Sequence, residues 1–182
     1  EAQALREADR ITLDTGDGAA VCFLGDPEEA LRVSLALQSD FLREGVEGIE
    51  GDDTDGHVDN VAIFIEPGVV VMQGCADRSL VDHERLLENR RVAERFDLAI
   101  REIPVLPTIT YHGEQVQVPY LNFYLVNGGA IVPVCGHPDD DEMLALLADY
   151  MPDREVVGLD IGGILAYGGG GIHCVTQQVP AV

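Results

Sequence analysis

A glycine-rich run that ends in a thiol is the part of the sequence best suited to covalent chemistry. Four consecutive glycines, Gly168 to Gly171, lead through Ile172 and His173 to Cys174. Such glycines allow positive φ values and a close approach of the backbone to another group. A thiol displayed there acts as a nucleophile when a neighbouring cation or His lowers its pKa. The alternative is a buried structural cysteine in a last strand, and the spacing alone leaves both interpretations open.

An acidic segment, residues 52–59, holds the second candidate group. His57 and Asp59 stand two positions apart on the approach to a predicted strand, so both side chains can point the same way. A His beside a carboxylate can serve as general acid and base. Carboxylates together with a Cys nucleophile suit a guanidinium, which they grip by two hydrogen bonds while the thiolate attacks the central carbon.

Two other interpretations of this acidic segment remain. It could hold a metal ion, although its spacing is not that of an EF-hand loop. It could also be a solvated acidic loop with an incidental His.

The charge of the chain limits the kinds of partner that it can bind. The formal net charge is -22, all 11 basic residues are Arg, and there is no Lys. Without Lys, Schiff-base enzymes and Walker-A phosphate loops are excluded. An acidic chain without a basic stripe also repels nucleic acid and anionic membrane surfaces. A small cation is the favoured partner, although a solvated surface explains much of the acid equally well.

The cysteines and the apolar runs indicate a cytoplasmic globular protein. Cys22, Cys75, Cys135 and Cys174 show no CxxC spacing and are expected to be reduced thiols. The first three are expected to be core or inert. No apolar run is long enough to span a membrane, and no secretory signal is visible. Because the chain begins with Glu1, a lost targeting segment stays open.

An internal repeat predicts the architecture. Residues 60–74 align without gaps on residues 122–136, pairing Asn60 with Asn122 and Gly74 with Gly136. Each copy predicts strand, tight turn and strand, then a helix (80–96 and 138–150) and a further strand (99–106 and 155–160). A ββαβ unit cannot close a core alone, so an α/β ring or pseudo-symmetric array of such units is expected. Residues 1–42 predict a separate N-terminal β-β-α segment.

Five segments in this order carry a family resemblance: 48–60, 67–70, 120–129, 152–158 and 169–178. From about residue 48 to residue 182 the chain resembles the C-terminal half of agmatine deiminases, in the bacterial-type peptidylarginine deiminase family. The resemblance implies the pentein fold, a five-bladed α/β propeller of ββαβ units, of which this chain would hold part.

The same resemblance implies roles for individual residues. Cys174 matches the nucleophile that forms an amidino-thioether, His57 the general acid/base, and Asp59 the carboxylate that engages the guanidinium. Gly171 would help shape the site. The implied reaction is hydrolysis of agmatine to N-carbamoylputrescine and ammonia, without a metal or cofactor. The cationic guanidinium substrate is the expected partner, with no nucleic acid or membrane; a homo-oligomer or a completing partner stays open.

The sequence departs from the family in three ways. The family's N-terminal half, with two further carboxylates, has no counterpart, and Gly171 replaces a family Asn. Residues 1–42 resemble instead the end of a class III nucleotide cyclase domain, in which Asp17 would bind a metal ion, with residues 43–47 as a junction. The alternatives are therefore an inactive fragment that binds guanidinium weakly and a cyclase-related regulatory module.

Overall fold

The computed structural model describes residues 58–96 and 98–177. His57, the segment 1–42 with Asp17, the junction 43–47 and Cys22 lie outside the described residues. Within the described part, no helix is both long and apolar enough to cross a bilayer.

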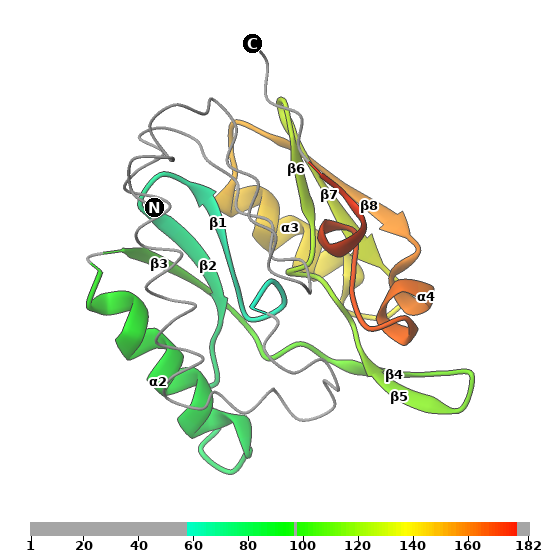
Figure 1. The fold of residues 1–182 in the computed structure, drawn as a ribbon, viewed down its shortest axis with the longest axis horizontal. Coiled ribbons are helices and arrows are strands. Elements are labelled where there is room, and N and C mark those ends of the chain that lie inside the picture. The colour runs from blue at the N-terminus through cyan, green and yellow to red at the C-terminus, as the bar shows by residue number, and fades with distance from the viewer. Residues whose placement is uncertain (1–57, 97, 178–182) are drawn as a thin grey trace, which may run out of the picture.

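Two ββαβ units form the framework (Figure 1). The first contains β1 (Ala62–Glu66), β2 (Val69–Gln73), α2 (Asp82–Glu94) and β3 (Ala99–Ile103). The second contains β6 (Tyr124–Val126), β7 (Gly129–Val134), α3 (Asp140–Tyr150) and β8 (Glu155–Asp160). In each, the first two strands pair antiparallel and the third pairs parallel to the second. The predicted repeat is confirmed, and each unit forms a three-stranded sheet.

The hairpins that open the units follow from local sequence. β1 and β2 are joined at Pro67 and Gly68, and Gly68 has a φ of +76°. β6 and β7 are joined at Asn127 and Gly128, where Gly128 has a φ of +75°. Because β-hairpin turns of this length require positive φ, glycine at these places fixes where each strand reverses.

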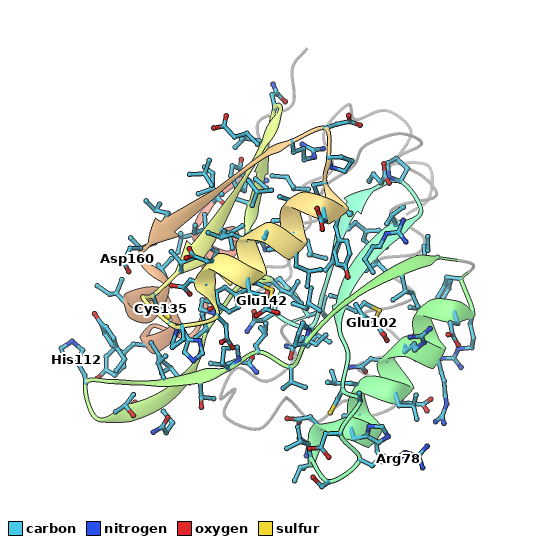
Figure 2. All side chains as sticks on the ribbon, turned by 180° about the vertical axis from the view of Figure 1, so that it is seen from behind. Arg78, Glu102, His112, Cys135, Glu142 and Asp160 are labelled. Carbon is cyan, nitrogen blue, oxygen red and sulfur yellow. The ribbon has the colours of Figure 1, made fainter. Side chains whose placement is uncertain are left out.

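Three elements were not predicted. A hairpin of β4 (Thr108–Tyr111) and β5 (Glu114–Gln117) joins the two units, and His112 lies at its tip, away from the sheets (Figure 2). The short helix α4 (Gly162–Tyr167) and a 3₁₀ turn (His173–Val175) follow β8. Cys174 therefore lies in an exposed turn, and the alternative of a buried cysteine in a last strand is wrong.

The segment between β5 and β6 forms the centre of the core. Val118, Tyr120, Leu121 and Phe123 are each 0% exposed, and they pack with apolar side chains of both units, including Val71, Ile103, Val132 and Leu147. Such burial contributes about 1.5–3 kcal/mol for each large apolar side chain. Asn122 is carried inside this apolar segment and is 1% exposed. The core thus fixes the position of one polar side chain.

Candidate active site

The thiol of Cys174 lies against the carboxylate of Asp59. The Cys174 Sγ–H donates to Asp59 Oδ2 over 3.1 Å, and the two residues are 115 apart in sequence. Asp59 belongs to the turn that precedes β1, in which the N–H groups of Val61 and Ala62 both donate to the C=O of Val58. The fold therefore brings together two of the residues predicted for the site, Cys174 and Asp59.

His173 binds the carboxylate and not the thiol. Its Nδ1 lies 2.8 Å from Asp59 Oδ2, and the ring is only 6% exposed. His173 thus orients Asp59 from the buried side, while Cys174 in the next position faces outward. The sequence suggested a thiol whose neighbouring His lowers its pKa, and the contact found is of a different kind.

Asn122 is a site residue that the sequence reasoning missed. Its Nδ2 donates to Cys174 Sγ over 3.1 Å, and its Oδ1 accepts from the Cys174 N–H over 3.1 Å. Its C=O accepts from the His173 N–H over 3.0 Å. One buried side chain therefore fixes both the backbone and the sulfur of Cys174. The repeat that pairs Asn122 with Asn60 was the available signal, because a polar residue kept inside an apolar run needs hydrogen-bond partners.

A second polar contact, which is partly buried, lies two residues before Asn122. Tyr120 OH donates to Asp140 Oδ1 over 2.6 Å, at the start of α3. The other oxygen, Asp140 Oδ2, accepts from the N–H of Gly136 over 2.7 Å and from that of Cys135 over 3.3 Å. This ties the central core segment to the second unit. Cys135 lies beside this junction (Figure 2), where burial and the charge of Asp140 raise the pKa of its thiol.

The ionisation of the pair is set by competing effects. Burial raises the pKa of Asp59, but hydrogen bonds from His173 and Cys174 outweigh it, and the net pKa lies below the ordinary value. Asp59 is therefore ionised at neutral pH. Burial and the negative charge of Asp59 raise the pKa of Cys174, against the lowering effect of hydrogen bonds from the Gly171 backbone and Asn122. The resting thiol is protonated and points at an anion.

Gly171 and Gly170 make this close packing sterically feasible. A Cβ on Gly171 would lie 2.5 Å from Asn122 Cβ, and a Cβ on Gly170 would lie 2.8 Å from Cys174 Sγ. At Gly171 the contact is with the buried side chain of Asn122, whereas at Gly170 it is with the exposed side chain of Cys174, which would have to move. Gly169 has a φ of +87°, a left-handed value that glycine adopts without strain. In this chain the glycine run thus provides the left-handed conformation at Gly169 and the close contact between Gly171 and Asn122.

Gly171→Ala is expected to lower the free energy of unfolding by about 1–3 kcal/mol, because the new methyl group overpacks a buried contact. It should also displace Asn122 from the thiol. Urea unfolding measures the first effect. Gly168→Ala is the milder comparison, since its Cβ would meet the Leu165 C=O at 3.3 Å and no atom closer than that. Equal stability of Gly171→Ala and the unchanged protein would contradict the contact.

Among residues 58–96 and 98–177, no group of three or more His, Cys, Asp and Glu is placed to hold a metal ion. The described cysteines, Cys75, Cys135 and Cys174, are all free thiols. The described part of the site consists of a thiol, a carboxylate, an amide and a buried imidazole.

Comparison with known proteins identifies the family of the chain. The model of the Porphyromonas-type peptidyl-arginine deiminase family matches residues 28–180, and the chain belongs to that family. The match includes residues 28–42, so the proposed cyclase-like origin of that stretch receives no support from it.

The relatives are agmatine deiminases. The chain is 36% identical to agmatine deiminase of Pseudomonas putida strain F1, over 85% of this chain and 48% of the relative. It is 33% identical to agmatine deiminase of Stutzerimonas stutzeri, with the same coverage of both chains. Agmatine deiminase of Enterococcus faecalis superposes with a TM-score of 0.63 at 29% identity, over 74% of this chain and 43% of that structure. The chain spans about half the length of the curated relatives it matches.

Proposed function

We propose that this chain hydrolyses the guanidinium group of agmatine to N-carbamoylputrescine and ammonia, with Cys174 as the nucleophile. The observation that carries the proposal is the 3.1 Å contact between the Cys174 thiol and the ionised Asp59 carboxylate. A nucleophile beside an anion suits a cationic electrophile, because the anion binds the charge while the sulfur faces the carbon. The agmatine deiminases among the relatives support the choice of substrate.

The substrate itself would activate the thiol. A guanidinium that binds Asp59 offsets the negative charge that raises the pKa of Cys174. The proton of the thiol can then leave, and Asn122 Nδ2 donates to the sulfur as it becomes negative. This arrangement keeps the thiol protonated until a cation arrives, which limits side reactions of an exposed cysteine.

The covalent steps balance with water as the only co-reactant. The thiolate attacks the central guanidinium carbon and forms a C–S bond. A C–N bond then breaks, and the nitrogen leaves as ammonia after accepting a proton. Water attacks the amidino-thioether carbon, the C–S bond breaks, and the product keeps a ureido group. In this proposal His57 gives and takes the protons, Asp59 holds the guanidinium, and Gly171 shapes the site beside Asn122.

The wider context of the reaction belongs to the same proposal. The two ββαβ units would be blades of a pentein propeller. The reaction would need no metal or cofactor, would act on a small cation in the cytoplasm, and would not involve nucleic acid or a membrane. Further carboxylates for the substrate would come from outside the described residues, either from a completing partner or from a second copy of the chain.

The test is direct product analysis. Agmatine is incubated with the folded chain, and ammonia and N-carbamoylputrescine are measured. A Pseudomonas putida agmatine deiminase preparation serves as the positive control. Release of both products in equal amounts supports the proposal. If the chain shows a cooperative unfolding transition but yields neither product while the control does, the proposal fails.

A further inference from the structure

A buried polar network lies next to the site but plays no part in the chemistry described above. Its centre is Gln73, the last residue of β2, which is 2% exposed. Gln73 Nε2 donates to the C=O of Asn60 over 2.7 Å. Gln73 Oε1 accepts from the N–H of Leu106 over 3.1 Å. The amide thus joins the turn before β1 to the segment after β3.

Asn60 is also held through its side chain. Its Nδ2 donates to Gln117 Oε1 on β5 over 2.9 Å, and Gln117 is 6% exposed. The backbone beside it is held as well, because the Gln73 N–H donates to the C=O of Val61 over 3.1 Å. Hydrogen bonds from two separate strands therefore fix the residue that follows Asp59.

Asp59 needs such support because no strand ladder sets its orientation. It lies in a turn, and its hydrogen bonds to His173 and Cys174 cross 114 and 115 residues of sequence. Its carboxylate must stay within hydrogen-bond distance of the sulfur. A side chain in a turn keeps such a position only when the neighbouring backbone is fixed.

We propose that Gln73 is a positioning residue for Asp59: by binding the C=O of Asn60, it holds the Asp59 carboxylate against Cys174. An apolar side chain of the same length would leave the Asn60 C=O and the Leu106 N–H buried without partners. Gln73 would then matter to the site without touching the substrate. The effect of Gln73 on catalysis rests on the proposed function. The contact between Asp59 and Cys174 does not, because the titration of the Cys174 thiol reports it without any turnover.

The experiment is the pH profile of Cys174 alkylation by iodoacetamide, followed by mass spectrometry of the Cys174 peptide. Among the described residues, Asp59 is the charged group that acts on this thiol and raises its pKa. Gln73→Met is expected to lower the midpoint by about half a pH unit, which means about threefold more thiolate at neutral pH. Asp59→Asn removes the charge altogether, so it should lower the alkylation midpoint further than Gln73→Met does. In the Asp59→Asn background, Gln73→Met should add nothing.

A destabilised control separates positioning from general loosening. Met143→Ala removes a core side chain of α3 that is 4% exposed, and the midpoint should not move. A folded Gln73→Met protein with an unchanged midpoint overturns the proposal, as does a further shift in the Asp59→Asn background. If Gln73→Met does not fold, Gln117→Leu removes the side-chain support of Asn60 instead, and the same two outcomes decide. Failure of agmatine turnover in the unchanged chain would defeat the proposed function and leave this titration result standing.

Discussion

Cys174→Ala is expected to abolish the release of ammonia from agmatine, with turnover falling by about a thousandfold or more. No other described thiol can replace it, because Asp59 and Asn122 both contact the sulfur of Cys174. The fold should survive, since Cys174 is exposed and its removal leaves the Ile172 and His173 contacts in place. Ammonia release and thermal unfolding, measured on the same preparation, check both statements.

Cys135→Ala is the matched control for that experiment. Cys135 is a half-buried free thiol that lies beside Asp140 at the start of α3. Turnover should be retained in this variant. Activity that persists in Cys174→Ala, or activity lost equally in both variants, would mean that the nucleophile has been misassigned.

Asp59→Asn is expected to move reactivity and catalysis in opposite directions. In the proposed mechanism the guanidinium loses its anionic partner, which should cost about 2–5 kcal/mol and lower kcat/KM by about 30-fold or more. The thiol, however, loses the charge that raises its pKa, so alkylation at neutral pH should become faster. The alkylation midpoint should fall below that of the unchanged protein. If burial alone raised the pKa of Cys174, the alkylation midpoint would not change in Asp59→Asn.

Steady-state kinetics with agmatine and the iodoacetamide profile together decide the role of Asp59. Asp77→Asn is a suitable control, because Asp77 is an exposed carboxylate that accepts hydrogen bonds from the N–H and the hydroxyl of Ser79. It should change neither measurement. If Asp59→Asn retains its kcat/KM, the carboxylate does not bind the substrate.

Much of the framework could be predicted, because the same ββαβ pattern occurs twice in the sequence. The repeat predicted a helix after each hairpin, at 80–96 and 138–150, and the helices are observed at Asp82–Glu94 and Asp140–Tyr150. It also predicted the closing strands: β8 occupies the predicted residues 155–160, whereas β3 begins at the predicted Ala99 but ends at Ile103, before the predicted residue 106. Periodicity and turn glycines are local signals, and here they agree with the tertiary structure. The hairpin β4–β5 was missed, since it lies between the repeated units and has no counterpart in the repeat.

The site was predicted less completely, for reasons of distance in sequence. Cys174 stood out because four glycines precede it, and Asp59 because it lies in an acidic segment. Asn122 did not stand out, since its surroundings in sequence are apolar and its partner is 52 residues away. His173 was considered as a neighbour of the thiol, but only the fold shows that its ring binds Asp59. Contacts between residues so far apart in sequence cannot be predicted from local sequence patterns.

The long sequence separation within the site also has a consequence for folding. The ββαβ units are built mainly from contacts within each unit, whereas the Asp59–Cys174 contact spans 115 residues. Long-range contacts bear the largest loop-closure entropy and tend to form late. A chain whose units are already formed would therefore still present Cys174 without Asp59 beside it. In that state the pKa of the Cys174 thiol is lower than in the native protein, because the charge of Asp59 is missing. Pulse alkylation of Cys174 during refolding should therefore slow down when the Asp59–Cys174 contact forms.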